Sequence, residues 1–105
     1  MLAGVANGEG TDTINAVRNV VGSEFADTIT GSAEPNEIVA LGGDDTVLGG
    51  DAPDIVLGGA GNDVLSGEGG SDRLLGEAGD DNLDGGVDTD FCDQGAGTGL
   101  IVNCP

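Results

Sequence analysis

The strongest constraint on the fold is a nine-residue spacing that runs through most of the chain. Eight successive units begin at residues 22, 31, 40, 49, 58, 67, 76 and 85, and each starts with Gly except the unit at Ala40. The sixth positions are Asp27, Asn36, Asp45, Asp54, Asp63, Asp72, Asp81 and Asp90. The eighth positions are Ile29, Ile38, Val47, Val56, Leu65, Leu74, Leu83 and Cys92. Self-similarity at a short fixed period is typical of a solenoid.

The repeat weakens at both ends. A unit at 7–15 has Asp12 and Ile14 at its sixth and eighth positions, but six extra residues separate it from the unit that begins at residue 22. A unit at 94–102 has Ile101 at the eighth position but Gly99 at the sixth. We therefore divide the chain into an N-terminal capping region, 1–21, with the divergent repeat 7–15; a repeat region, 22–93; and a C-terminal cap, 94–105.

The spacing predicts short strands and sharp turns. Three residues around position eight form a minimal strand with the middle side chain inward, and the Gly-rich positions before it allow the backbone to turn. Two units, with two strands and two turns, make one coil of about 18 residues. The expected fold class is all-β: a parallel β-roll, a right-handed solenoid of two short parallel sheets.

Composition narrows the function. The 105 residues carry 20 Asp and Glu against two Lys and Arg, a net charge of −18, which argues against nucleic acid or an anionic membrane surface as partner. There is no His, so imidazole catalysis is absent. The acidic pairs Asp44–Asp45 and Asp80–Asp81 each join a repeat Asp to a turn neighbour, and we do not expect an enzyme. The alternative to a folded domain, a disordered acidic segment, does not explain why the eighth position of each unit is apolar.

Stacked coils would bring the Asp residues into two files that need a cation. At a strand spacing of about 4.8 Å, neighbouring carboxylates repel by roughly 3 kcal/mol at an effective dielectric of 20. Carboxylates with backbone carbonyls form an all-oxygen cage, which favours Ca²⁺ over Mg²⁺, and the chain lacks the usual ligands of Zn²⁺.

The units also resemble a known family. "GGAGNDVLS" (58–66) fits the G-G-x-G-x-D-x-U-x nonapeptide of RTX (repeat-in-toxin, hemolysin-type) calcium-binding proteins, and "GEGGSDRLL" and "GEAGDDNLD" differ from it only at position two. The resemblance covers residues 7 to 102. It implies a parallel β-roll with Ca²⁺ between turns two units apart, bound by carbonyls two and four and the Asp of the earlier turn, and by carbonyls one and three and the Asp of the later turn.

Carried onto this chain, the resemblance implies four good sites, each named below by its two Asp residues. The Asp63–Asp81 site comprises Gly59, Gly61 and Asp63 with Gly76, Ala78 and Asp81. The Asp54–Asp72 site comprises Gly50, Ala52 and Asp54 with Gly67, Gly69 and Asp72. The Asp45–Asp63 site comprises Leu41, Gly43 and Asp45 with Gly58, Ala60 and Asp63. The Asp72–Asp90 site comprises Glu68, Gly70 and Asp72 with Gly85, Val87 and Asp90.

Two further sites depart from the family pattern. Asn36 replaces Asp, so its site with Asp54 should be weak, and the site joining Asp27 to Asp45 has Phe25 in its turn. We expect roughly four to six calcium ions.

Cys92 and Cys104 permit one disulfide, which would tie the last coil to the roll and imply an oxidising compartment. The other possibility is a buried thiol at Cys92 and a frayed one at Cys104. Together these features favour a secreted, monomeric calcium-binding module that folds on binding Ca²⁺, a stabilising tail or spacer attached to a larger secreted protein. The alternative is an adhesin-like solenoid that binds a protein or surface and holds structural calcium.

Overall fold

The computed structural model describes residues 3–5, 13–15, 19–26 and 28–104, and these residues form a flattened coil of short strands. The molecule measures 36 × 32 × 13 Å, so it is only two sheets thick. The predicted Asp27 and most of the unit at 7–15 lie outside the described residues. None of the described segments forms a helix that could span a membrane.

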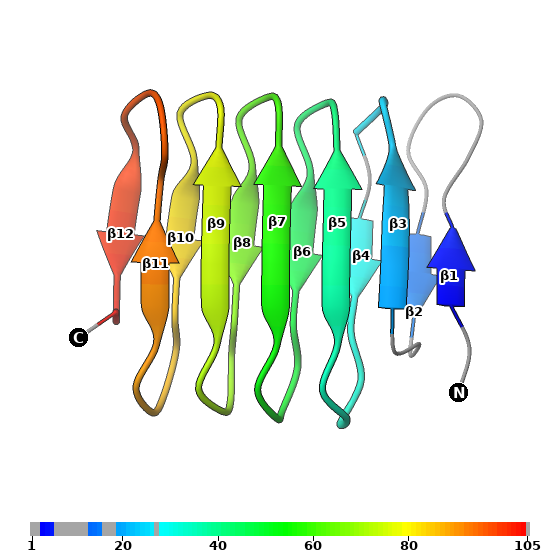
Figure 1. Ribbon diagram of the computed structural model, residues 1–105, viewed down its shortest axis with the longest axis vertical. Coiled ribbons are helices and arrows are strands. Elements are labelled where there is room, and N and C mark those ends of the chain that lie inside the picture. The colour runs from blue at the N-terminus through cyan, green and yellow to red at the C-terminus, as the bar shows by residue number, and fades with distance from the viewer. Residues whose placement is uncertain (1–2, 6–12, 16–18, 27, 105) are drawn as a thin grey trace.

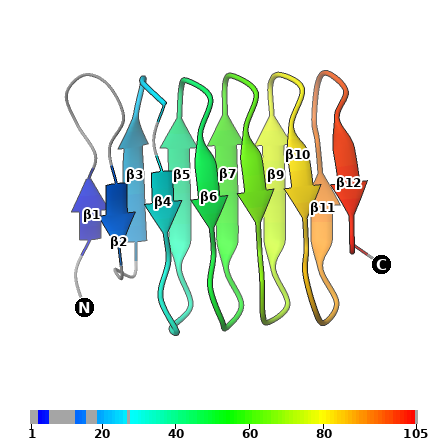
Figure 2. The same cartoon turned by 180° about the vertical axis from the view of Figure 1, so that it is seen from behind.

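Strands of odd number form the first sheet, in the order β1-β3-β5-β7-β9-β11 (Figure 1). Their bounds are Ala3–Val5, Asn19–Ser23, Glu37–Leu41, Ile55–Gly59, Arg73–Glu77 and Phe91–Asp93. The second sheet lies behind it and has the order β12-β10-β8-β6-β4-β2 (Figure 2). Its strands, β2 to β12, are Thr13–Asn15, Thr28–Thr30, Thr46–Leu48, Val64–Ser66, Asn82–Asp84 and Leu100–Val102.

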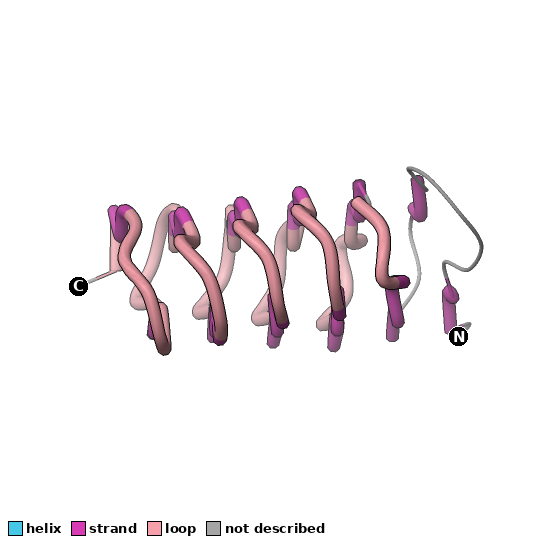
Figure 3. The backbone as a smooth tube through the Cα atoms, turned by 90° about the horizontal axis from the view of Figure 1, so that it is seen from above, coloured by secondary structure: helices cyan, strands magenta, loops and turns pink. Residues whose placement is uncertain are grey.

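The register confirms that one coil consists of two units. Val56 pairs with Leu74 in the first sheet and Val47 with Leu65 in the second, and all pairs are parallel. Successive coils therefore lie side by side with their turns aligned along two edges, as the view along the strands shows (Figure 3). We call the edge with turns 42–45, 60–63, 78–81 and 94–99 the upper edge. The edge with turns 31–36, 49–54, 67–72 and 85–90 is the lower edge.

The core is one inward side chain per unit. Every predicted eighth-position residue from Ile29 to Leu83 is at most 1% exposed, and Cys92 packs against this cluster half-buried. In β3, before the first full unit, Val20 is buried and Val21 is 41% exposed, so Val20 faces the core and Val21 faces solvent.

The first-sheet strands β3, β5, β7 and β9 have five residues, two more than predicted. In β5, β7 and β9 the strand continues through positions one and two of the next unit. Position one therefore faces inward in these strands, beside the following turn; it is glycine in β7 and β9 and Ala40 in β5.

At the C-terminus the predicted disulfide is present. Cys92 in β11 is bonded to Cys104, with their Cα atoms 6.0 Å apart, and no described cysteine is free. The alternative of two thiols is therefore wrong. The bond joins the residues that follow β12 to the opposite sheet.

Candidate calcium sites

The sixth-position acids are buried side chains. The exposed fraction of Asp45, Asp54, Asp63, Asp72, Asp81 and Asp90 ranges from 0% to 4%. Each Asp is the last residue of its turn, and the exposed residue that follows it begins the next strand. Because side chains alternate along the chain here, the Asp carboxyl group lies inside the roll. Burial of ionised carboxylates without a counter-charge is costly, and so the arrangement requires compensation.

One carboxyl oxygen of each later Asp binds the preceding coil. The backbone N–H of Asp45 donates to Asp63 Oδ1 at 2.8 Å, and that of Asp63 donates to Asp81 Oδ1 at 2.8 Å. On the lower edge Asp54 and Asp72 donate in the same way to Asp72 and Asp90, at 2.8 and 2.7 Å. The predicted pairs of Asp residues are thus brought together at every one of the four sites.

The other carboxyl oxygen faces the following coil. The Oδ2 atoms of Asp54, Asp63, Asp72, Asp81 and Asp90 are buried and accept no hydrogen bond within the described part of the chain. A Cβ built on Gly58 would lie 2.6 Å from Asp63 Oδ2 and 2.9 Å from the Gly76 carbonyl oxygen. At Gly49 the corresponding distances, to Asp54 Oδ2 and the Gly67 carbonyl, are 2.7 and 3.0 Å.

In both cases the two oxygens belong to one predicted ligand set. Asp63 and Gly76 come from different turns and were both assigned to the Asp63–Asp81 site, and the same holds for Asp54 and Gly67 in theirs. Glycine at position one leaves open the space where the two oxygens meet. The residues present therefore fit a hard cation bound between turns, for which carboxylate and carbonyl oxygens are the preferred ligands.

Without an ion these carboxyl groups resist ionisation. Burial raises the pKa of Asp63 from 3.8 to about 7, opposed by the hydrogen bond from the Asp45 N–H and reinforced by neighbouring carboxylates. Burial likewise raises the pKa of Asp72 to about 7 and of Asp54 to about 6, and it raises the pKa of Asp81. A divalent cation would remove this penalty, because it favours the ionised form.

The turns hold a regular left-handed backbone at the positions expected to supply carbonyls. Gly43, Gly50, Gly59, Gly61 and Gly70 have φ between +87° and +105°. Leu41, Ala52 and Glu68 adopt φ of +79°, +90° and +73° at equivalent positions, where a side chain makes this conformation unfavourable by roughly 1–2 kcal/mol each. The carbonyl at position two accepts a hydrogen bond from the next coil: the Ala78 N–H donates to the Gly59 carbonyl at 3.1 Å.

Two predicted sites differ in their surroundings. Asn36 is buried where Asp is expected, and its Oδ1 accepts a hydrogen bond from the Ser32 N–H at 2.8 Å. Ala40 is completely buried and lies opposite Gly58 by register, because Val39 pairs with Leu57. Its methyl group therefore points toward the Asp45–Asp63 site, where the other three good sites have a glycine.

Sequence reasoning missed a second ladder, on the solvent side of the upper edge. The N–H of Asn62 donates to Asp44 Oδ1, that of Asp80 to Asn62 Oδ1, and that of Thr98 to Asp80 Oδ1, each at 2.8 Å. The signal was available, since all four are the fifth residue of every second unit. By sequence alone, Asp44 and Asp80 are only turn neighbours of the repeat Asp, and no role is assigned to Asn62 or Thr98.

No group of three or more His, Cys, Asp or Glu side chains suited to a metal occurs among the residues described. Each of the four good sites uses two carboxylates and would draw its remaining ligands from the backbone. Such a site does not depend on a side-chain cluster of that kind.

The comparison with protein families agrees with this geometry. The model of the RTX calcium-binding nonapeptide repeat, which comprises four copies, matches residues 21–56, 48–83, 57–92 and 67–101. These overlapping stretches together span residues 21–101, or 81 of the 105 residues. No match was found among curated proteins.

Proposed function

The chain belongs to the RTX calcium-binding nonapeptide repeat family, and we propose that it is an extracellular module whose β-roll folds when Ca²⁺ fills the stacked turns. The observation that carries the proposal is the two files of buried Oδ2 atoms, represented by Asp63 on the upper edge and Asp72 on the lower edge, which accept no hydrogen bond from the described residues and face a carbonyl of the next coil. Such an oxygen is costly in an ion-free fold and becomes a ligand once calcium is present.

Folding and binding are coupled under this proposal. The core supplies one modest apolar side chain per nine residues, and the turns add buried like charges. Because the cage exists only when two coils are stacked, the free energy of calcium binding contributes directly to folding. Affinity in the extracellular range, about 10⁻⁴–10⁻³ M per site, would keep the chain unfolded at low calcium.

The disulfide indicates the compartment in which the module works. A Cys92–Cys104 disulfide suits an oxidising compartment, and so we place the module outside the cell. We propose residues 22–93 as the calcium-binding part and 94–105 as a cap, with four ions held firmly and up to two more at the sites of Asn36 and Asp27. The role is non-catalytic: a monomeric stabilising tail or spacer of a larger secreted protein.

An adhesin-like role would use an outer sheet face. The first sheet exposes Ile55 and Phe91 by 41% and 51%, and the guanidinium of Arg73 lies 5.4 Å from the Phe91 ring centroid. Scattered apolar residues of this kind are normal on a soluble surface. They do not favour adhesion over the module role.

The test is a calcium titration followed by far-ultraviolet circular dichroism, with magnesium as control and a chelator to reverse it. We expect a cooperative gain of β-structure with calcium alone. Complete β-structure in chelator would show that the ion is not needed for folding. No structure in saturating calcium would overturn the proposal.

A further inference from the structure

The C-terminal end of the lower edge repeats the arrangement of the internal sites with a different partner. Asp90 is 4% exposed, and its Oδ2 accepts no hydrogen bond from the described residues. A Cβ built on Gly85 would lie 2.5 Å from this oxygen and would meet the carbonyl oxygen of Asn103. Asn103 lies two units after Gly85, in the position that Gly76 holds for Gly58.

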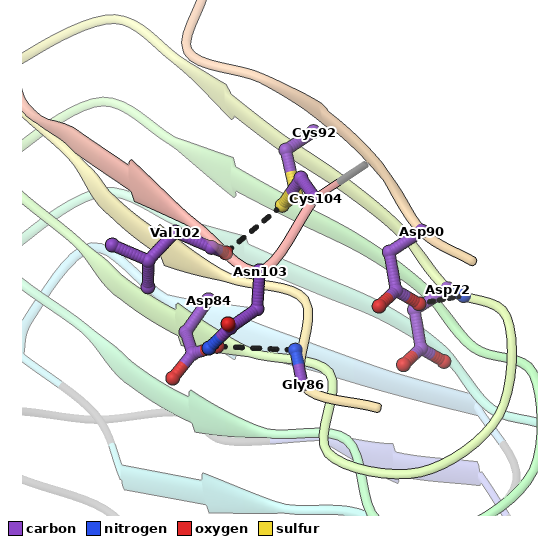
Figure 4. Close-up of a disulfide and its surroundings, with 8 residues drawn as sticks. All are labelled: Asp72, Asp84, Gly86, Asp90, Cys92, Val102, Asn103 and Cys104. Atoms are coloured by element: carbon purple, nitrogen blue, oxygen red, sulfur yellow. Dashed lines mark hydrogen bonds between the residues drawn. A yellow bond between two sulfur atoms is a disulfide. The ribbon is translucent and has the colours of Figure 1, made fainter. Parts of the chain in front are cut away.

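Three contacts hold the segment around Asn103 in place, and Figure 4 shows Asn103 next to Asp84 and Cys104. Asp84 of β10 pairs with Val102 of β12, and the Gly85 N–H donates to the Val102 carbonyl at 3.1 Å. The Asn103 side-chain amide donates to Asp84 Oδ1 at 2.8 Å, and the Gly86 N–H donates to the same oxygen at 3.0 Å.

The third restraint is covalent. The residue after Asn103 is Cys104, whose disulfide to Cys92 joins this segment to β11. Asn103 itself has φ of +55°, a left-handed conformation that Asn tolerates better than most residues. The disulfide thus fixes the segment directly beside the turn that ends in Asp90.

Asp90 can serve two ions at once. Its Oδ1 accepts the hydrogen bond from the Asp72 N–H at 2.7 Å and faces the preceding coil, where the Asp72–Asp90 site lies. Its Oδ2 faces the opposite way, toward Asn103. Gly86 and Asp88 have φ of +92° and +74° and hold the second and fourth turn positions, whose carbonyls serve the internal sites.

We propose that Asp90 and Asn103 form an additional calcium site, completed by the carbonyls of Gly86 and Asp88 and by water, and that the Cys92–Cys104 disulfide assembles it. The proposal rests on the calcium-binding function proposed above. One carboxylate replaces two, so this terminal site binds Ca²⁺ more weakly than the four good sites and fills after them. Water is an ordinary ligand of Ca²⁺, so an open site is chemically adequate.

The consequence is a coupling between oxidation and calcium. Reduction releases Cys104 and lets Asn103 leave the turn, so the terminal site is lost while the internal sites, built from residues 41–90, are kept. The complete set of ions therefore forms only in the oxidised protein.

The experiment is a calcium titration of the full, ¹⁵N-labelled chain followed by the backbone amide shifts of each residue. In the oxidised protein we expect the amides of Gly86, Asp88 and Asn103 to shift in a late step, after those of Gly59 and Gly61. Reduction with a phosphine should abolish the late step alone.

A pair of matched variants keeps the test decisive if reduction disorders the last coil. Gly85→Ala places a methyl group in the terminal site, and Gly85 is not among the glycines with positive φ. It should lose the late step and keep the step at Gly59 and Gly61, because these two residues belong to the Asp63–Asp81 site, which does not contain Gly85. Gly58→Ala should perturb the step at Gly59 and Gly61 and keep the late one.

The inference is overturned if the oxidised protein shows no late step, or if Gly85→Ala leaves that step unchanged. In either case internal shifts would still support the proposed function. If calcium shifts no amide anywhere, the proposed function fails as well.

Discussion

Replacing Asp63 by Asn should change the stability of the protein in opposite directions with and without calcium. Asp63 is 1% exposed and belongs to two predicted sites, with Asp45 on one side and Asp81 on the other. An amide keeps the shape of the carboxyl group and removes its charge. The amide oxygen of the new side chain would still accept the hydrogen bond from the Asp45 N–H, and its amide nitrogen would face the Gly76 carbonyl. Asn36 shows that the fold accommodates an amide at this position of a unit.

The size of the expected stabilisation follows from the raised pKa of Asp63. In the ion-free fold burial raises the pKa of Asp63 from 3.8 to about 7. Three pKa units correspond to about 4 kcal/mol when the group is ionised. The molecule is only 13 Å thick, so nearby solvent screens part of this penalty. We therefore expect Asp63→Asn to stabilise the ion-free fold by about 2–4 kcal/mol at pH 7.5.

The assay is urea unfolding followed by circular dichroism, in chelator and in saturating calcium. In chelator the variant should unfold at higher urea than the wild type, or should regain β-structure where the wild type has none. In calcium it should unfold at lower urea, because two cages each lose a carboxylate. Asp51→Asn, which removes an exposed charge of the same sign, is the control and should change both midpoints little. A variant less stable than the wild type in chelator would refute the reasoning.

Three further predictions concern pH, one site and the core. In chelator the free energy of unfolding should fall as the pH rises from about 4 to about 7. The folded pKa values of Asp63 and Asp72 are raised from 3.8 to about 7, so their stabilising contribution is complete below 3.8 and is lost as the pH rises through 7. Acid titration of the dichroism signal measures this, and stability rising with pH in chelator would contradict it. Ala40→Gly should strengthen calcium binding at the Asp45–Asp63 site in calorimetry while weakening the ion-free strand by about 0.5–1 kcal/mol, and unchanged affinity would show that the methyl group does not enter the site. Leu65→Ala should destabilise the calcium-loaded protein by about 2–5 kcal/mol in urea unfolding, whereas Val64→Ala, at a 45% exposed position, should have a much smaller effect.

The strands, the core and the family were predictable because the repeat encodes them locally. A fixed apolar position in every unit identifies Leu65 and its equivalents as core, and a pair of units defines the coil. The RTX resemblance read from "GGAGNDVLS" is confirmed by the family match over residues 21–101. The disulfide could be predicted as a possibility only, because spacing does not fix whether Cys104 reaches Cys92.

Features that depend on contact between coils were harder to predict. The ladder from Asp44 through Asn62 to Asp80 exists only once turns of successive coils are stacked in register, and single side chains there look like solvated charge. The position of Asn103 beside Asp90 was equally hard to predict, because Asn103 follows the last recognisable unit and the residues around it match no repeat. Asp84 lies outside the sixth position of the repeat, yet it accepts hydrogen bonds from both Gly86 and Asn103.

The distribution of these features along the roll predicts the order in which it folds. Each coil pairs only with its neighbours, so the stability of a stretch depends on its own sites and interfaces. The coils near the N-terminus contain Asn36, which lacks a carboxylate, and Ala40, whose methyl group points toward a site. The coils from β8 to β11 have Asp at every sixth position and are closed by the disulfide.

Folding should therefore begin in the C-terminal half and spread toward β4 as calcium rises. Hydrogen exchange at intermediate calcium measures this order residue by residue, and amides of β8 to β10 should be protected at lower calcium than those of β4 and β5. Asn36→Asp should reduce the difference, since it restores the missing carboxylate of one site. Protection that appeared at the same calcium concentration throughout would mean that the coils fold as one unit. In that case the coupling between neighbouring coils would exceed the difference between their sites.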